Sequence, residues 1–453
     1  MKKMGAARLK VILSAAILMA GLALTILAVS SETTETSSGI VIDFGDGDTI
    51  YTYVDFDSFT DPIAALESAC SSQDLELEIV DGKVQRIASV ENDGKASWTF
   101  FEVQAGEDEW SHVDDLSSVE MGMATISCWG FCADGSVPSP AVDVTGHSIY
   151  GITVPKRVIT IAPSCTETVC AAGGTDLIIG TDIYSNYPME IVDGRASGSI
   201  AEVGGFTNPS YESILKEDPD LVFCIGSQNS HLQLASKLRS NGVDVVVMSG
   251  GEDVTTVLDN IFMAGVVLGT QTETNDLISE LQTQMAQVQE EISDGEGVWN
   301  KRVMVSLSAM KSPWVSGSDT YISDIMSGIM VTNIYSGESG WVQVNAETIL
   351  KNDPEYIVVV SSDYSATQGD YDSMLASMSS EWRGTSAYKN GNIFLLTGDA
   401  ADLASRPGPR VAQITELFAR ILQGSAFDDG IQVPMFIGDE YRDYLTFSKE
   451  GSI

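Results

Sequence analysis

The sequence is poor in histidine and in the motifs of catalysis. Three histidines, His112, His147 and His231, occur in 453 residues, and no two have the spacing of a metal-binding pair. This excludes zinc-protease motifs and histidine-rich zinc or manganese sites. A Gly-x-x-x-x-Gly-Lys phosphate loop, a Gly-x-Ser-x-Gly motif and a dinucleotide-binding glycine pattern are also missing. We therefore expect no catalytic residues, no bound metal and no cofactor, and assign any ATP hydrolysis to another chain.

Basic residues are scarce as well. The chain has 24 Lys and Arg against 64 Asp and Glu, a formal net charge of -40. Nucleic acid and anionic lipid surfaces repel such a protein. The composition thus excludes nucleic acid as a partner and predicts a highly soluble, acidic surface.

The six cysteines leave their pairing open. Cys128 and Cys132 could pair with each other, or one of them could pair with Cys70. A zinc site would need four ligands at familiar spacings, which are missing, so a structural role is favoured. The other three lie in apolar surroundings and are predicted to be core residues: Cys165, Cys170 and Cys224.

The first 30 residues have the pattern of an export signal. Basic residues precede an unbroken apolar run from Val11 to Val29, which fits a cleaved signal peptide or an uncleaved membrane anchor. No cysteine follows the run, so a lipoprotein anchor has no attachment point. Residues 31–38 are a polar linker. We expect an extracytoplasmic protein that meets the membrane only through its N-terminal segment.

Residues 39–145 predict a small, β-rich α+β module. Short alternating runs such as Ile50–Val54 and Ser97–Val103 indicate strands, and Gly and Asp turns separate them. One helix, Asp61–Ala69, begins with a capping Asp and a Pro in its first turn.

After Pro155 apolar strands alternate with helices, which is typical of parallel sheets covered on both faces. We divide this part into an N-terminal lobe (156–270), a bridging helix (271–294), a C-terminal lobe (300–424) and a tail (425–453). Apolar residues at helical spacing define one face of the bridging helix: Leu277, Leu281, Met285, Val288 and Ile292.

The two lobes repeat one sequence. Glu212-Ser-Ile-Leu-Lys-Glu-Asp-Pro-Asp-Leu-Val matches Glu347-Thr-Ile-Leu-Lys-Asn-Asp-Pro-Glu-Tyr-Ile, and Arg157-Val-Ile opens the first lobe as Arg302-Val-Met opens the second. A match of this length with its flank in the same order indicates duplication. The predicted fold is α/β: two similar lobes joined by one long helix and preceded by the small module. Two unrelated Rossmann-like domains are the alternative.

With these segments, residues 156 to about 423 resemble the helical-backbone (type III) periplasmic substrate-binding proteins of ABC importers. Within that class, Arg157-Val-Ile-Thr-Ile-Ala-Pro-Ser-Cys-Thr-Glu-Thr, Tyr184-Ser-Asn-Tyr-Pro and Asp218-Pro-Asp-Leu-Val are similar to the cobalamin-binding member of the cobalamin and iron-siderophore group. The resemblance implies a ligand cleft between the lobes and partners in a membrane permease and its ATPase subunits.

Seven residues of this sequence match ligand-contacting positions of that group: Tyr184, Tyr187, Phe206, Trp314, Trp341, Asp402 and Arg406. The resemblance implies aromatic cleft walls and two polar groups that hydrogen-bond the ligand edge. Each has an ordinary alternative, because lone aromatics are commonly core residues and Arg406 before Pro-Gly-Pro could cap a helix.

The resemblance also gives Glu212 and Glu347 a role. One acidic residue on each lobe docks into arginine pockets of the permease in this family, and these two match those positions. Alternatively, both are ordinary first-turn carboxylates that favour the helix dipole.

The implied ligand is a small-molecule metal chelate, with a cobalt corrinoid (cobalamin or cobinamide) first and a ferric siderophore or haem as the alternative. Few basic residues are available for an anionic siderophore, which favours the corrinoid. The module at 39–145 resembles, more weakly, the β-rich domain at the carboxyl end of transcobalamin-like proteins. A surface interaction protein without a transport role is the third hypothesis.

Overall fold

The computed structural model describes residues 37–44, 49–55, 61–73, 75–104, 111–113, 115–119, 125–133, 143–147, 149, 154–295 and 300–449. The predicted signal segment lies outside these residues. Within them, no helix has the length and apolar character needed to cross a bilayer. The chain forms two compact units, the first within residues 1–152 and the second comprising 143–145 and 153–453.

The first unit is a small α+β module with its own core. One sheet has the order β2-β1-β8-β6-β7 and a smaller one the order β3-β4-β5. Helix α2 (Pro62–Ser72) begins after the Asp61 side chain, which accepts a bond from the Ile63 amide, as the sequence predicts. Trp98 and Trp129 lie in the core that α2 covers. The strands are β1 (Ser37–Asp43), β2 (Thr49–Asp55), β3 (Leu77–Val80), β4 (Lys83–Ile87), β5 (Val90–Glu91), β6 (Ala96–Gln104), β7 (Ser111–His112) and β8 (Thr125–Ala133).

The second unit begins with a lobe built on a parallel sheet of order β11-β10-β9-β14-β15. Strand β14 is buried at every position, because helices cover both faces of such a sheet. The strands are β9 (Val158–Thr160), β10 (Ile178–Thr181), β11 (Ala201–Glu202), β14 (Leu221–Ile225) and β15 (Asp244–Met248), with a hairpin of β12 (Gly204–Gly205) and β13 (Asn208–Pro209). The helices are α3 (Pro163–Val169), α4 (Met189–Ser197), α5 (Tyr211–Lys216), α6 (Asn229–Arg239) and α7 (Val254–Leu268).

The C-terminal lobe has a mixed sheet of order β19-β17-β16-β20-β21-β22, with β18 beside β16. Its last strand comes from the tail, which therefore belongs to the lobe. The strands are β16 (Arg302–Ser306), β17 (Trp314–Ser316), β18 (Thr332–Asn333), β19 (Trp341–Gln343), β20 (Tyr356–Val360), β21 (Ile393–Leu396) and β22 (Phe436–Ile437). The helices are α9 (Tyr321–Gly328), α10 (Ala346–Asn352), α11 (Gln368–Ser377), α12 (Ser380–Arg383), α13 (Ser386–Asn390), α14 (Gly398–Ser405) and α15 (Val411–Gln423).

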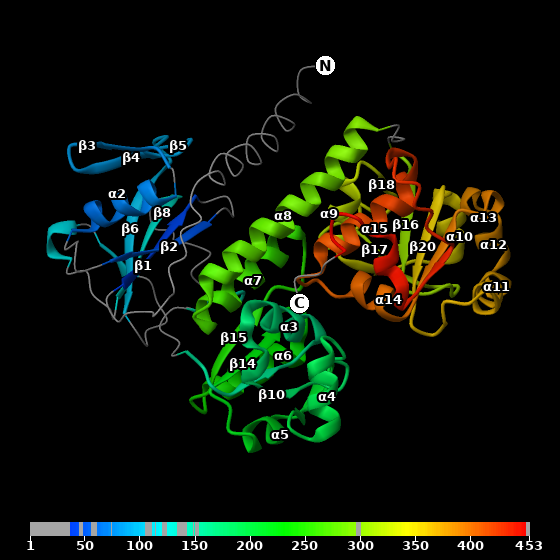
Figure 1. The fold of residues 1–453 in the computed structure, drawn as a ribbon, viewed down its shortest axis with the longest axis horizontal. Helices are drawn as coiled ribbons and strands as arrows, with labels where there is room; N and C mark the ends of the chain where they lie inside the picture. Colours follow the sequence, from blue (N-terminus) through cyan, green and yellow to red (C-terminus); the bar gives the residue numbers. More distant parts are fainter. Residues whose placement is uncertain are drawn as a thin grey trace. The chain divides into compact units, whose positions relative to one another are not determined.

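One long helix, α8 (Gln271–Asp294), links the two lobes (Figure 1). Four of the five residues predicted for its apolar face are buried in the main core, and Met285 packs against that core. Helix α8 packs closely against α7. A Cβ atom added at Gly265 of α7 would lie only 2.0 Å from the hydroxyl oxygen of Thr274 in α8. The prediction of an α/β fold with two lobes and a connecting helix is confirmed.

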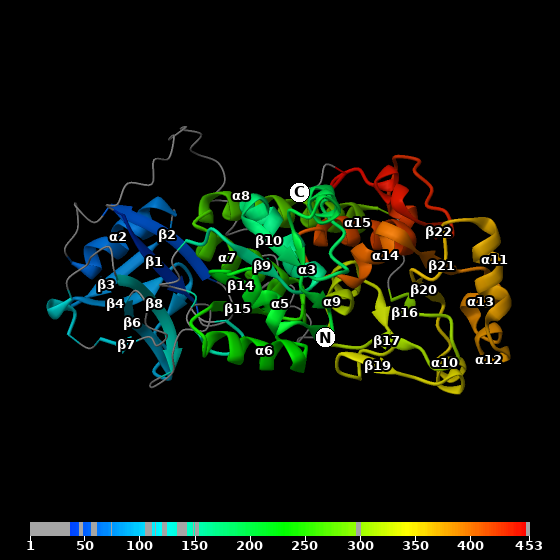
Figure 2. The ribbon, with the colours of Figure 1, turned by 90° about the horizontal axis from the view of Figure 1, so that it is seen from below.

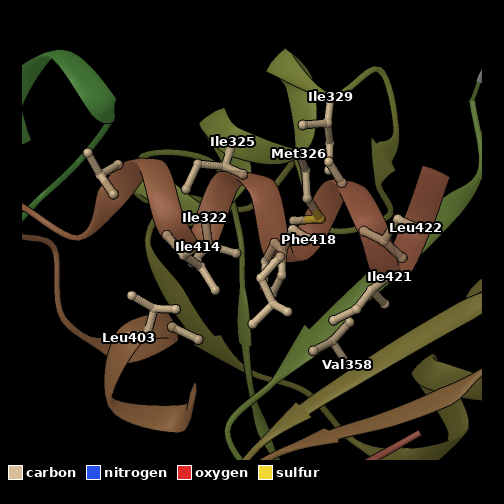
Figure 3. Close-up of a cluster of buried hydrophobic side chains, with 14 of the residues drawn as sticks. Ile322, Ile325, Met326, Ile329, Val358, Leu403, Ile414, Phe418, Ile421 and Leu422 are labelled. Atoms are coloured by element: carbon tan, nitrogen blue, oxygen red, sulfur yellow. The ribbon is translucent and has the colours of Figure 1, made fainter. Parts of the chain in front are cut away.

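Helix α15 is buried along its whole length and organises the main core. Its residues Ile414, Phe418 and Leu422 face α9 residues such as Ile325 and Met326 (Figure 3). The helix also buries polar residues such as Glu416 and Arg420, which hydrogen-bond each other, so its burial on all sides does not depend on apolar residues alone. On the other side of the C-terminal lobe, α11, α12 and α13 cover the sheet (Figure 2).

The sequence repeat has a structural counterpart in each lobe. Arg157, beside the first strand of its lobe, donates to the Asp218 carbonyl (2.9 Å), and Arg302, in the first strand of the other lobe, donates to the Asp353 carbonyl (2.5 Å). Asp218 and Asp353 both have positive φ, at 49° and 42°, where the chain turns after the repeated helix. The duplicated sequence therefore forms the same turn in both lobes.

All six cysteines are free thiols. Cys128 and Cys132 are four residues apart on β8, about 13 Å at the usual strand rise, so they cannot form a disulfide with each other. Burial raises the pKa of Cys70 and Cys224 to about 12, which is the behaviour expected of core thiols.

Candidate functional site

The loop after β10 carries Tyr184, whose ring is 56% exposed. The Asp182 carboxylate accepts bonds from the Tyr184 amide (2.8 Å) and the Ser185 hydroxyl (2.6 Å). The Arg195 guanidinium donates to the carbonyl oxygens of Ile183 (3.0 Å) and Ser185 (2.7 Å). These bonds fix the loop, so Tyr184 is a solvent-facing ring on a rigid support.

Phe206 lies half-buried in the β12–β13 turn, where His231 holds it. The two ring centroids are 5.4 Å apart in an edge-on arrangement, and Nε2 of His231 lies 2.6 Å from the Phe206 carbonyl oxygen. The Ile225 amide donates to Nδ1 of the same ring (3.3 Å), so Nε2 carries the proton and donates. The hairpin is bonded to the Tyr184 loop through the Ile183 amide and the Gly204 carbonyl (3.0 Å). Lobe one therefore brings the segments of Tyr184 and Phe206 together.

Trp314 and Trp341 lie on neighbouring antiparallel strands. In the β17–β19 register Trp314 pairs with Gln343 and Ser316 pairs with Trp341, so both tryptophans share one face of the sheet. Trp314 is 49% exposed, and Trp341 is half-buried against the main core. Lobe two therefore brings its two predicted tryptophans together. That the two pairs of aromatics bind one ligand stays a prediction.

Sequence reasoning missed three large apolar side chains beside these aromatics. Ile183, Met189 and Met310 are all exposed, the first two in the segment after β10 and the third in the loop between β16 and β17. Single exposed apolar residues are common on protein surfaces, so these three are added to the candidate surface only because they lie within a few residues of Tyr184 or Trp314 in the sequence. Their position after the first or second strand of a lobe, in otherwise polar loops, was the available signal.

A buried ionic cluster joins the two lobes. Glu167 of α3 is 1% exposed and accepts two bonds from Arg410, one from Nε (2.8 Å) and one from Nη2 (2.7 Å). Arg406 adds a third bond to the same carboxylate (3.0 Å). Burial alone would lower the pKa of Arg410, but the facing Glu167 carboxylate raises it above its usual value. Such a pair is charge-assisted and bidentate, the strongest kind of side-chain contact.

The predicted polar ligands Asp402 and Arg406 belong to this cluster. They pair with each other (2.9 Å), and Asn186 of lobe one donates to Asp402 (2.9 Å) and accepts from Arg406 (2.6 Å). Both groups therefore lie side by side, and their bonds to Asn186 and Glu167 run between the lobes; that they hydrogen-bond a ligand stays a prediction. Sequence reasoning did not identify Glu167, Asn186 or Arg410 as partners of these residues.

Tyr187 is also an interlobe contact. Its ring lies 4.4 Å from the guanidinium carbon of Arg410, and its hydroxyl accepts a bond from Arg442 of the tail (2.8 Å). The ring face and the hydroxyl are thus already engaged by arginines. A direct ligand contact for Tyr187 stays a prediction.

The proposed docking residues occupy equivalent places. Glu212 and Glu347 lie exposed in the first turns of α5 and α10, each two residues after the N-cap residue, Ser210 or Asn345. Their exposure permits contact with a partner, and their helix positions also favour a carboxylate on electrostatic grounds.

A hollow of about 480 Å³ lies between residues 252–253 and residues 318–336. It is lined by polar side chains that include Glu252, Asp253, Asp319 and Asp324, and by none of the seven predicted ligand residues. Asp324 accepts a bond from the Val254 amide (3.0 Å), and burial raises the pKa of its carboxyl group. Within the described ranges, no group of three or more potential ligands is arranged to hold a metal ion.

Two curated relatives match this chain in sequence. An uncharacterised ABC transporter substrate-binding lipoprotein of Bacillus subtilis is 23% identical over 276 residues, which cover 61% of this chain and 82% of the relative. A cobalamin-binding protein of Halobacterium salinarum is 23% identical over 283 residues, which cover 61% and 72%.

Solved structures agree on the fold. A periplasmic haem-binding protein from Pseudomonas aeruginosa superposes with a TM-score of 0.52 at 19% identity, covering 62% of this chain and all of that one. A family model described as periplasmic binding protein matches residues 158–400, more than half of the sequence. The chain therefore belongs to the periplasmic binding protein family, whose members are transport proteins and not enzymes.

Proposed function

We propose that this chain is the extracytoplasmic substrate-binding component of an ABC importer and that it captures a corrinoid between its lobes. The family membership supports the transport role. The corrinoid is supported by the relative from Halobacterium salinarum, which is named for cobalamin binding.

The observation that carries the proposal has two parts: apolar side chains are exposed in both lobes, and the charges of nearby arginines are already balanced by carboxylates. Tyr184 and Ile183 in one lobe, and Trp314 and Met310 in the other, offer apolar surface to a large flat ligand. Burying such rings against a macrocycle gains free energy at a small ordering cost.

Two arginines beside these loops, Arg406 and Arg410, argue against a strongly anionic ligand. Arg406 is paired with Glu167 and Asp402, and Arg410 is paired with Glu167. The carboxylates of haem or of an acidic siderophore need cations that are free to pair with them. A corrinoid, whose edge carries mainly neutral amides, suits this surface better.

Release to the membrane is the second half of the proposal. Glu212 and Glu347 dock onto a permease, one from each lobe, and the importer's ATPase subunits drive release. Two separated charges on one protein fix its orientation on a partner.

A ligand titration tests the proposal. The full chain is mixed in turn with cobalamin, cobinamide, haem and a ferric siderophore, and tryptophan emission is followed. We expect saturable quenching by cobalamin or cobinamide. Quenching by haem or the ferric chelate alone would change the ligand class, and no response to any of them would favour a surface protein without a transport role.

Trp314→Ala tests the aromatic surface. The side chain is 49% exposed, so its removal should cost little stability, yet it should weaken corrinoid binding by about tenfold or more. Leu350→Ala is the matched control, because Leu350 is 40% exposed on α10 and outside the site. Equal affinities of the two variants would remove Trp314 from the ligand site.

A further inference from the structure

The tail contributes a residue to the interlobe contacts. It lies beyond residues 158–400, which the family model matches. After β22 joins β21 in register (Leu395 with Phe436), the 3-10 helix η6 (Asp439–Tyr444) carries Arg442 toward lobe one. There Nη2 of Arg442 donates to the Tyr187 hydroxyl (2.8 Å), across 255 residues of sequence.

The support behind Arg442 is rigid. Tyr441 is fully buried and donates to Oε1 of Gln413 on α15 (2.6 Å). The Asp439 carboxylate accepts a bond from the Asp399 amide at the start of α14 (3.0 Å). Helix η6 is therefore fixed on two helices of its own lobe, and Arg442 extends from a firm base.

Arg442 differs in pairing from the other arginines of the interlobe cluster. Arg406 and Arg410 each form an ion pair with Glu167, whereas the hydrogen bond described for Arg442 goes to a neutral phenol. Its guanidinium carbon lies 5.6 Å from the Tyr187 ring and 4.9 Å from the Tyr441 ring. Asp399 is near enough to interact with it electrostatically. Two arginines therefore contact the Tyr187 side chain, Arg410 at its ring and Arg442 at its hydroxyl, and we call this arrangement the clasp.

Tyr187 ends the loop that presents Ile183 and Tyr184. Within lobe one, Asp182 and Arg195 hold the first part of this loop. Its far end is held from lobe two, through Asn186 to Asp402 and through Tyr187 to Arg442. A loop fixed at both ends loses less conformational freedom when a ligand binds, and this raises affinity.

We propose that Arg442 is a positioning residue for the ligand site: by clasping Tyr187 it sets the Tyr184 loop against the second lobe before the ligand arrives. This inference rests on the proposed ligand-binding function. It assigns the C-terminal tail a role in affinity that the family model does not cover.

The test uses the full chain and cobalamin as the probe. Arg442→Gln removes the charged donor, and Tyr187→Phe removes the acceptor while keeping the ring. Each should weaken cobalamin binding by about fivefold to tenfold. The double variant should bind cobalamin no more weakly than the weaker-binding single variant, because both substitutions remove the same contact. Arg442→Lys, which keeps a charged donor, should recover part of the loss.

Arg383→Gln is the matched control. Arg383 is an exposed arginine of the same lobe that bonds a carbonyl of that lobe, the Ala376 oxygen (2.7 Å), and its loss should leave affinity unchanged. Thermal unfolding of every variant separates a loss of fold from a loss of positioning.

Three results would overturn the inference. They are unchanged affinity in Arg442→Gln, affinity losses in the two single variants that simply add in the double variant, and a loss that follows the unfolding temperature alone. A wild-type protein that binds none of the four ligands would instead refute the proposed function. If the wild-type protein binds only haem or the ferric chelate, the same variants are titrated with that ligand, and unchanged affinity in Arg442→Gln overturns the inference there as well.

Discussion

His231 is buried completely in lobe one, and both of its ring nitrogens have partners. Burial lowers the pKa of the imidazole below its ordinary value of about 6.5. Protonation would also place a second N–H opposite the Ile225 amide, where an acceptor is needed. The neutral ring is therefore part of the support for Phe206.

This gives a pH dependence with a defined sign. Because the unfolded chain takes up a proton at His231 more readily than the folded chain, stability falls as pH drops below about 6.5 and stops falling below the folded pKa. His231→Gln should flatten this part of the curve, measured as unfolding temperature between pH 7 and pH 5. Parallel curves for the wild type and the variant would show that His231 does not titrate on unfolding.

At this scale the sequence predicts residue types better than residue partners. Trp314 and Trp341 were selected because they match ligand-contacting positions of the resembled group; both lie on strands, where Trp314 is exposed and Trp341 is half-buried. The Glu167–Arg410 pair joins residues 243 positions apart, and neither residue has a local pattern that names its partner. One sequence without related sequences beside it cannot supply that information.

Among the elements, the tail depends on one buried carboxylate. Glu416 of α15 has no exposed surface and accepts bonds from the amides of Thr446 (2.6 Å), Phe447 (3.0 Å) and Ser448 (2.9 Å). It also pairs with Arg420 (2.8 Å), which holds Asp429 at the start of the tail (2.8 Å). The charge of Glu416 thus satisfies three backbone donors and one cation at once.

Glu416→Gln should destabilise the tail by about 3 kcal/mol, because Gln keeps one acceptor oxygen but removes the charge that pairs with buried Arg420 and places an NH2 donor among backbone amides that need an acceptor. Hydrogen exchange at the amides of residues 446–448 measures the effect directly. Glu290→Gln, at an exposed position on α8, is the control and should leave this exchange unchanged. Unaltered protection in Glu416→Gln would show that the tail is held by other contacts.

How well a helix or strand can be predicted from sequence depends on its length and on how often its apolar pattern repeats. Helix α8 extends over Gln271–Asp294, as its apolar spacing indicates, since five apolar residues recur at helical spacing along its 24 residues. Strand β22 has two residues, too few for any alternation to appear, and its place in the sheet depends on contacts with β21. The tail therefore could not be assigned to the lobe from sequence.

At the scale of the molecule, the duplication is the feature that the sequence makes most visible. The repeated segment places Glu212 and Glu347 in the first turn of equivalent helices, α5 and α10. A gene duplication preserves such positions whatever they do. Their function therefore needs an experiment that separates ligand capture from transport.

Reversing both charges, Glu212→Lys with Glu347→Lys, should leave corrinoid affinity intact and abolish uptake by cells that carry the complete importer. The control reverses two exposed acids of α8, Glu273→Lys with Glu290→Lys, which changes the net charge equally. Normal uptake with the first double variant, or equal loss with both, would refute specific docking.

The Glu167–Arg410 pair has a further consequence for unloading. Separating the lobes at this point would break the buried bidentate contact, and the hydration that both charges then regain would offset part of the cost. In the proposed function, this contact is one that the permease would have to separate when it opens the lobes.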